Sequence, residues 1–263
     1  MIPEALRQAL LTPRRVAVAF SGGMDSAVLL ACAARVLGPE RVIALHAVGE
    51  VFPPRERIWA RETARQLGIR LEEIPVDLLA LPAFRENPPD RCYHCKRHLL
   101  RLFLEEARRL GAEVLWEGTH QDDLSASRPG LKALSELGVR SPLAEAGLNK
   151  KAVQALARKM GLPQAEKLPS PCLATRFPPG EPVTREGLYL VYRAEEALRD
   201  LLGEETLRVR YVRGEARLEV PPEALPRVFS QRWRIVTLLR KWGFRRISLD
   251  LEGYSSSRPP EKA

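Results

Sequence analysis

The chain has 263 residues, of which 45% are hydrophobic and 29% charged, a composition that excludes a disordered chain and suits one domain of ordinary size with a smaller one. Lys and Arg outnumber Asp and Glu by 42 to 33, and the net charge of +9 suits a phosphate-bearing or nucleic-acid partner, but an arginine-rich composition is also what a GC-rich or heat-adapted genome would produce. No run approaches the roughly 18 apolar residues of a membrane-spanning helix, and no basic stretch followed by an apolar run opens the chain, so we expect a cytoplasmic protein with no membrane contact.

Up to about residue 170, short β-branched runs alternate with stretches of helical periodicity. The predicted strands cover residues 16–20, 42–46 and 114–118, and the predicted helices cover residues 25–37, 55–67 and 97–110. Gly38, Gly68 and Gly111 each follow a predicted helix, where a left-handed residue commonly ends the helix. This alternation is typical of the α/β class, in which a parallel sheet is covered by helices on both faces.

Five prolines between residues 168 and 182 end the alternation. We therefore predict one domain over residues 1–180 and a smaller one over residues 181–263. In the second, a helix is predicted over 185–202, strands over 206–212 and 216–220, a helix over 226–242 and a last strand over 245–251. This αββαβ order indicates a small α+β domain, for which we predict a role in substrate binding or oligomerisation.

The first predicted strand runs directly into Ser21-Gly22-Gly23-Met24-Asp25-Ser26, which opens a helix. Two glycines after a buried strand let the backbone turn tightly and approach a phosphate group, and the amides at the start of the helix donate to an anion. The hydroxyls of Ser21 and Ser26 add donors, and Asp25 can hold the Mg²⁺ that neutralises a pyrophosphate. The motif is not a Walker A sequence, because it lacks the Gly-Lys-Ser/Thr ending.

This hexapeptide resembles the PP-loop of the N-type ATP pyrophosphatases, which include the GMP, NAD and argininosuccinate synthetases and the tRNA thiolases. The resemblance implies a Rossmann-like fold and cleavage of ATP between its α- and β-phosphates, so that an acceptor oxygen is adenylated before a nucleophile displaces AMP. Three further candidate ligands of the nucleotide or Mg²⁺ follow a predicted strand, at the edge where open α/β sheets bind ligands: Thr119, Asp122 and Asp123. For either aspartate, a helix N-cap is the alternative.

The sequence contains four cysteines. Cys32 lies in an apolar run of helical spacing and is predicted to be a core residue. The other three are candidate metal ligands or nucleophiles: Cys92 and Cys95, at C-x-x-C spacing just before a predicted helix, and Cys172. Three thiolates could complete a 4Fe-4S cluster with one open iron, could bind zinc with His94 or His98 as fourth ligand, or could include a nucleophile with a resolving thiol.

The sequence around these cysteines resembles LarE, a family of ATP-dependent sulfur transferases that make the organic part of the nickel-pincer cofactor of lactate racemase. The resemblance is carried by residues 87–96, 118–124, 138–143 and 170–176, and it continues through residues 208–210, 216–220 and 249–254. It therefore covers nearly the whole chain, with motifs more specific than the PP-loop alone.

The resemblance implies that a carboxylate of pyridinium-3,5-biscarboxylic acid mononucleotide is adenylated and becomes a thiocarboxylate. In family members with a single cysteine, the position of Cys172 gives up its own sulfur. Members with three cysteines hold a 4Fe-4S cluster whose open iron binds sulfide from an external donor. Because Cys92 and Cys95 are present, the resemblance favours the cluster over a sacrificial Cys172. It also implies a homo-oligomer, typically a hexamer.

Three arginines are candidate site residues. Arg176 follows Cys172 by four positions and could hold a carboxylate or phosphate of the substrate, or could instead pair with a nearby acid. Arg208 and Arg210 alternate onto one face of a predicted strand and, by the family match, help to hold the substrate phosphate. With Asp25 and Cys172, Arg176 completes the predicted catalytic set.

Three rival functions remain open. A tRNA thiolase shares the adenylation chemistry and is favoured by the net charge, but no recognisable RNA-binding module fits in 263 residues, so we expect no nucleic-acid partner. An amidating synthetase leaves three clustered thiols unexplained. A zinc-binding module without activity leaves the PP-loop unexplained.

Overall fold

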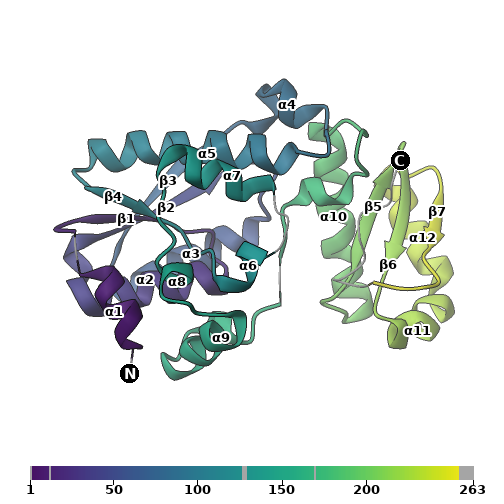
Figure 1. Ribbon diagram of the computed structural model, residues 1–263. Coiled ribbons are helices and arrows are strands. Elements are labelled where there is room, and N and C mark those ends of the chain that lie inside the picture. The colour runs from purple at the N-terminus through teal and green to yellow at the C-terminus, as the bar shows by residue number, and fades with distance from the viewer. Residues whose placement is uncertain (1, 12, 126–128, 169, 255–263) are drawn as a thin grey trace. The chain divides into compact units, whose positions relative to one another are not determined.

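The computed structural model describes residues 2–11, 13–125, 129–168 and 170–254 (Figure 1). The chain divides into two compact units. Unit 1 consists of Met1–Gly49, Pro54–Val76 and Cys92–Ser170, and unit 2 consists of Glu50–Pro53, Asp77–Arg91 and Pro171–Ala263. Two short segments from the first half of the chain therefore belong to the unit that contains the C-terminal part. The predicted division between residues 180 and 181, and the role of the smaller domain, stay predictions.

Unit 1 is built on a parallel sheet with the strand order β3-β2-β1-β4. The strands are β1 (Val16–Ala19), β2 (Val42–Val48), β3 (Arg70–Pro75) and β4 (Val114–Trp116). Val16 pairs in register with Val42 on one side and with Val114 on the other. The predicted parallel sheet of the α/β class is confirmed. Strand β3 was not predicted, because it is a sheet edge on which every residue keeps some exposure and charged residues replace the usual apolar run.

Helices flank this sheet on both faces (Figure 1). In the described part of unit 1 they are α1 (Glu4–Leu10), α2 (Met24–Leu37), α3 (Pro54–Leu67), α5 (Arg91–Arg109), α6 (Gln121–Ser125), α7 (Pro129–Leu137), α8 (Pro142–Glu145) and α9 (Lys150–Lys159), with 3₁₀ helices at Pro39–Arg41 and Pro163–Ala165. Helices α1, α3 and α9 pack against α2, and α5 lies on the opposite face of the sheet. Helix α5 begins six residues before the predicted helix over 97–110, so Cys92 and Cys95 lie within its first two turns and not before it.

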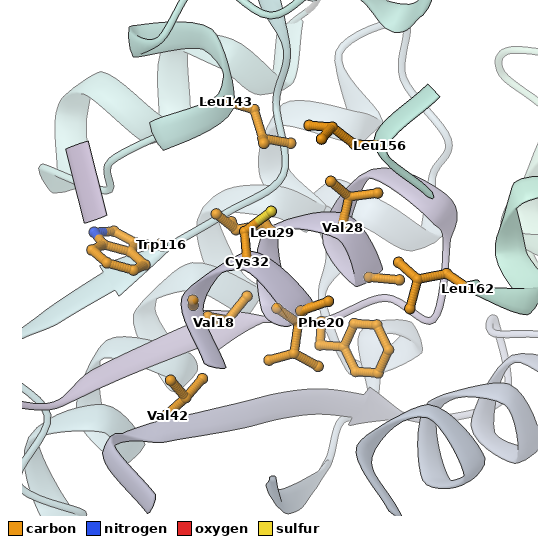
Figure 2. Packing of buried hydrophobic residues seen from close by; sticks show 14 of the residues in the cluster. Val18, Phe20, Val28, Leu29, Cys32, Val42, Trp116, Leu143, Leu156 and Leu162 are labelled. Carbon is orange, nitrogen blue, oxygen red and sulfur yellow. The ribbon is translucent and has the colours of Figure 1, made fainter. Parts of the chain in front are cut away.

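The core of unit 1 fills the space between β1, β2 and the helices around α2 (Figure 2). Figure 2 shows Val18 and Phe20 from the region of β1 beside Val28 and Leu29 of α2. Cys32 is fully buried in this cluster, and burial raises the pKa of its thiol to about 12. The prediction of a core cysteine is confirmed, and this thiol is kept in its protonated, unreactive form.

Unit 2 contains a small mixed sheet with the order β5-β6-β7. Strands β5 (Arg208–Val212) and β6 (Glu215–Glu219) are antiparallel, and β7 (Ile247–Leu249) runs parallel to β6. The helices are α4 (Pro82–Arg85), α10 (Arg185–Leu202), α11 (Leu225–Ser230) and α12 (Arg232–Lys241), with 3₁₀ helices at Leu78–Ala80, Leu173–Arg176 and Pro222–Ala224. The predicted α+β class is confirmed, although the helix predicted over 226–242 is two helices that break at Gln231.

The ends of α10 show how the sequence sets its limits. Thr184 is the N-cap, and its hydroxyl accepts a hydrogen bond from the Gly187 amide at 3.1 Å. Gly203 ends the helix in the left-handed conformation at φ +59°. In the part of the chain that the structure describes, none of the helices combines the length and the apolar character needed to cross a bilayer.

Candidate active site

The PP-loop connects β1 to α2 at the carboxyl edge of the unit 1 sheet. Gly22 has φ +83°, and a Cβ atom there would lie 2.9 Å from the carbonyl oxygen of Glu56, so both the conformation and the packing require glycine. The hydroxyls of Ser21 and Ser26 lie 3.1 Å apart, and Ser26 Oγ also donates to the Gly23 carbonyl. Asp25 lies in the first turn of α2, with its side chain 31% exposed. The loop therefore fits a phosphate group, with hydroxyls and a helix start on one side and an accessible carboxylate beside it.

Two lysines that sequence reasoning missed meet this loop. Lys150, 125 residues along the chain from Asp25, places Nζ 2.7 and 2.8 Å from the two carboxylate oxygens. Lys167 donates to Glu56 Oε2 at 2.6 Å and to the Gly22 carbonyl at 3.2 Å. Burial lowers the pKa of Lys167, although the carboxylate of Glu56 opposes the shift. The loop lacks a lysine of its own, and the fold supplies two from distant segments.

The segment after β4 lies beside the PP-loop, because a Cβ on Gly118 would come within 2.8 Å of the Ser26 amide nitrogen. Thr119, one of the candidate ligands, is buried, and its amide and hydroxyl both donate to Glu117 at 2.9 Å. Glu117 also accepts from Lys96 Nζ at 3.0 Å and from the Ser141 hydroxyl. Glu117 thus binds donors from α5, from the segment after β4 and from the start of α8. No motif in the sequence predicted this role.

The other two candidates in this segment lie in the first turn of α6. Asp122 Oδ2 accepts from the backbone amide of Lys150 at 2.8 Å, and Asp123 Oδ2 accepts from the amide of His120 at 3.1 Å. Both carboxylates therefore bind backbone amides in this structure. Their predicted roles toward the nucleotide or Mg²⁺ stay predictions.

The three candidate cysteines are distributed over both units. Cys92 is exposed and Cys95 half-buried near the start of α5 in unit 1, while half-buried Cys172 belongs to unit 2. Within the described residues, no group of three or more His, Cys, Asp or Glu side chains is arranged to hold a metal ion. The three thiols supply the right donor chemistry for a cluster, but the structure does not itself display the site.

One hydrogen bond links the sequences around these cysteines. Arg91, the residue before Cys92 and the last residue of its unit 2 segment, donates from Nη1 to the Ala174 carbonyl at 2.8 Å. Ala174 lies two residues after Cys172. Arg91 is itself held by Asn87, a buried residue at φ +55° whose side-chain amide donates to the carbonyls of Pro178 and Glu181 at 2.6 and 2.9 Å. The segment that leads to Cys92 is therefore fixed to the segment that follows Cys172.

Arg176 is 1% exposed and forms a bidentate pair with Glu195, with Nε and Nη2 at 2.8 and 2.9 Å from the two carboxylate oxygens. Its remaining nitrogen, Nη1, donates to the carbonyls of Pro171 and Cys172 at 3.0 and 3.3 Å. The sequence left two interpretations of Arg176, a contact with the substrate or an ion pair with a nearby acid. The structure contains the ion pair. Arg176 holds the backbone of Cys172.

Arg208 and Arg210 project from β5 beside this group. Arg210 forms a bidentate pair with Glu219 at 2.9 and 2.7 Å and donates from Nη1 to the Thr175 carbonyl at 2.9 Å. Arg208 is 5% exposed and lies 4.9 Å from the ring of Tyr254. Burial lowers the pKa of Arg208, and the nearby Arg176 lowers it further. The structure thus brings Arg176 and Arg210 to the loop of Cys172 and Arg208 into the electrostatic range of Arg176, although sequence reasoning missed the glutamates that hold Arg176 and Arg210.

Comparison with known proteins identifies the family. Residues 2–167 match the asparagine synthase family. Over 250 residues, the chain is 37% identical to the pyridinium-3,5-bisthiocarboxylic acid mononucleotide synthase of Lactiplantibacillus plantarum, which covers 95% of this chain and 90% of that protein. The chain is a LarE-like sulfur transferase of the PP-loop superfamily.

Two further relatives show which other proteins this LarE-like chain is similar to. It is 38% identical over 257 residues to an uncharacterised protein of Synechocystis, covering 97% of this chain and 95% of that one. It is 30% identical over 210 residues to a glutamine-hydrolysing GMP synthase component of Methanosphaerula palustris, covering 74% and 67%. The predicted family and the predicted enzymatic nature are confirmed, which sets aside the zinc-binding module, and the PP-loop family suggests ATP with Mg²⁺ as the cofactors.

Proposed function

We propose that this enzyme adenylates a carboxylate of pyridinium-3,5-biscarboxylic acid mononucleotide and converts it into a thiocarboxylate. The observation that carries the proposal is the 37% identity, over 95% of the chain, to a synthase whose product is the corresponding bisthiocarboxylic acid mononucleotide. The PP-loop supports it, because a carboxylate becomes a good electrophile only once AMP is attached.

In the adenylation step, a carboxylate oxygen of the substrate attacks the α-phosphorus of ATP, the bond to the bridging oxygen of the β-phosphate breaks, and pyrophosphate leaves. Ser21 and Ser26, with the amides around Gly22 and Gly23, bind the pyrophosphate. Asp25 is the residue that would hold Mg²⁺, which neutralises the developing charge when bound. We propose Thr119, Asp122 and Asp123 as further contacts for the nucleotide or the metal, because they follow Gly118, which packs against the Ser26 amide.

The arginines of unit 2 suit the substrate, which carries two carboxylates and a phosphate. Arg176 and Arg199 both contact Glu195, and Arg208 is close enough to affect the same carboxylate, so guanidinium charge exceeds the charge of that acid. We propose that Arg208 and Arg210 hold the substrate phosphate. Arg176 acts by fixing the backbone of Cys172 for the sulfur transfer.

We propose that a 4Fe-4S cluster bound by Cys92, Cys95 and Cys172 is the sulfur source, with an external donor renewing the sulfide. When bound, such a cluster supplies a sulfide nucleophile that is reactive at neutral pH. The support for this set is the donor chemistry of the three thiols, together with the resemblance that favours a cluster when Cys92 and Cys95 are present. In the competing route, the Cys172 thiolate attacks the adenylated carbonyl and AMP leaves, which forms a thioester. A base then removes the Cα proton of Cys172, the Cα–Cβ double bond forms, and the Cβ–S bond breaks, so that the thiocarboxylate departs with its electron pair and dehydroalanine remains.

The experiment combines two measurements on protein prepared without oxygen. Release of pyrophosphate from ATP that depends on the dicarboxylate mononucleotide tests adenylation, and its absence would contradict the proposed function. Iron and acid-labile sulfide near four per chain establish the cluster. No iron, with loss of the mass of one hydrogen sulfide from the chain after one turnover, establishes a sacrificial Cys172.

Two further expectations belong to this proposal. We propose a homo-oligomer, a hexamer by resemblance, which light scattering of the purified enzyme tests. The net charge of +9 keeps a tRNA thiolase as the second candidate. A gel shift with total tRNA at physiological salt separates the two, because a thiolase binds tightly and with strong salt dependence.

A further inference from the structure

The carboxylate that is expected to hold Mg²⁺ already has a cation beside it. Lys150 Nζ lies 2.7 and 2.8 Å from the two oxygens of Asp25. Asp25 is in the first turn of α2, and Lys150 is the first residue of α9. Their side chains are 31% and 48% exposed, so solvent and a ligand can reach the pair.

Lys150 occupies a position that the helix itself does not favour. The N-terminus of a helix carries partial positive charge and favours carboxylates, yet α9 begins with Lys150 and Lys151 and has no acid in its first turn. The Asn149 side chain caps the helix by accepting from the Ala152 amide at 2.9 Å. A lysine at this end therefore destabilises α9 slightly. The ion pair with Asp25 offsets that cost.

The surrounding backbone fixes the start of α9 beside the PP-loop. The Lys150 amide donates to Asp122 Oδ2 at 2.8 Å, and the Gln121 amide donates to the Leu148 carbonyl at 2.8 Å. The same segment reaches the loop through Gly118, against which the Ser26 amide packs. Lys150 thus has a fixed backbone and a flexible four-carbon side chain within reach of any phosphate bound by the loop.

Lys167, the other lysine at the loop, is held in place by partners within the protein. Its side chain is 12% exposed and binds Glu56 and the Gly22 carbonyl. Moving it would leave the largely buried Glu56 carboxylate without its cation. Of these two lysines, Lys150 is the one whose partner, Asp25, would gain a replacement cation on binding Mg²⁺.

We propose that Lys150 occupies the place of Mg²⁺ at Asp25 in the nucleotide-free enzyme and becomes a ligand of the pyrophosphate group when Mg²⁺ and ATP bind. The inference rests on the proposed function. Once the metal neutralises Asp25, the three N–H donors of the ammonium group turn to phosphate oxygens, where charge-assisted hydrogen bonds are strongest. Lys150 would then neutralise part of the charge of the leaving pyrophosphate, beside the Mg²⁺ that Asp25 would hold.

The test measures the affinities of the enzyme for Mn²⁺ and for a nucleotide analogue. The proposal predicts that replacing Lys150 raises the first affinity and lowers the second. Mn²⁺ binding without nucleotide is followed by electron paramagnetic resonance, and binding of α,β-methylene-ATP, which resists cleavage at this bond, is followed by calorimetry in the presence of Mg²⁺. In Lys150→Met, Mn²⁺ alone binds about threefold tighter, because its competitor is gone. The nucleotide analogue binds about tenfold weaker, because a phosphate ligand is lost.

Lys151→Met is the matched control, because it removes the same charge from the exposed neighbouring position. It leaves both affinities within about twofold of the wild type, whereas Lys150→Arg keeps Mn²⁺ binding at the wild-type level. Equal thermal midpoints show that each variant is folded.

The proposal is overturned if Lys150→Met leaves both affinities unchanged, if both fall together, or if Lys151→Met has the same effects. A wild-type enzyme that binds the analogue but releases no pyrophosphate with the mononucleotide contradicts the proposed function, while the comparison of variants still decides the role of Lys150.

Discussion

Arg176 and Glu195 form a bidentate ion pair in which each side chain is only 2% exposed. The carboxylate of Glu195 also accepts from Arg199 Nη2 at 3.0 Å and from the Val209 amide at 3.1 Å. One acid therefore connects α10, strand β5 and the backbone of the loop that carries Cys172. The pair is structural, and it also fixes the arginine that binds the backbone carbonyl of Cys172, the residue for which we propose a role in sulfur transfer.

Replacing Glu195 by Gln is expected to lower the free energy of unfolding by about 3–5 kcal/mol, because it leaves the buried Arg176 guanidinium without its counter-charge. Urea denaturation measures the loss. Asp200→Asn, an exposed position on the same helix, is the control and changes stability by less than about 0.5 kcal/mol. A Glu195→Gln protein as stable as the control would show that the pair contributes little.

The Arg176–Glu195 pair also predicts that the free energy of unfolding depends on pH. Burial favours the neutral form of Glu195, but the charges of Arg176, Arg199 and Arg208 outweigh it and hold the pKa below its ordinary 4.5. The folded protein then binds fewer protons here than the unfolded chain, so the contribution to stability is complete above pH 4.5 and is lost as the pH falls through the folded value. The gap in stability between the wild type and Glu195→Gln should narrow from pH 7 to pH 3, as urea titrations at each pH will show; a constant gap would contradict the assignment.

Asp25→Asn is expected to reduce pyrophosphate release by about 100-fold or more, because the residue that would hold Mg²⁺ loses its charge. The fold is kept, since the side chain keeps its shape and is partly exposed. Pyrophosphate release in the presence of the mononucleotide measures the effect, and thermal unfolding checks the fold. Unchanged release would remove Asp25 from the mechanism.

Cys172→Ala should abolish formation of the thiocarboxylate but spare the pyrophosphate release that reports adenylation, because the thiol acts after AMP is attached. Mass spectrometry of the mononucleotide product follows the sulfur. Cys92→Ala separates the two sulfur sources: it abolishes transfer if a cluster supplies the sulfur and leaves a single turnover if Cys172 does. A Cys172→Ala enzyme that still makes thiocarboxylate would exclude both routes.

Gly22→Ala is expected to weaken nucleotide binding by about tenfold or more, because the added methyl group meets the Glu56 carbonyl and displaces the phosphate-binding backbone. The positive φ adds a stability cost of about 1–2 kcal/mol. Gly161→Ala is a matched control, since Gly161 has φ +67° and an added methyl group there would meet nothing within 4 Å. Both variants should lose stability, and calorimetry with the nucleotide should detect a binding defect in Gly22→Ala alone.

The elements that the sequence predicted are those whose burial leaves a periodic apolar pattern, such as β1, β2 and α2. Strand β3 escaped because an edge strand can be formed by charged residues: Glu73, on this strand, is bound by Arg57 and Arg61 of α3. The first turns of α5 escaped because Cys92 to Lys96 is a polar stretch without an apolar stripe.

The candidate site was predictable only where its chemistry is local in sequence. The PP-loop is six consecutive residues, so its function can be read directly. Lys150 and Lys167 reach it across 125 and 145 residues, and no spacing rule connects them to it. Glu195 gave no signal either, because a buried acid is recognisable only from the arginines packed around it in the folded chain.

Because unit 2 is assembled from three separate stretches, the chain passes between the units five times. On the ribosome, Asn87 is made 90 residues or more before the carbonyls of Phe177, Pro178 and Glu181 that its side chain binds. The early stretches therefore cannot complete these contacts until more than two thirds of the chain has been synthesised. Exchange of one continuous stretch of sequence between relatives could therefore not transfer unit 2 as a whole.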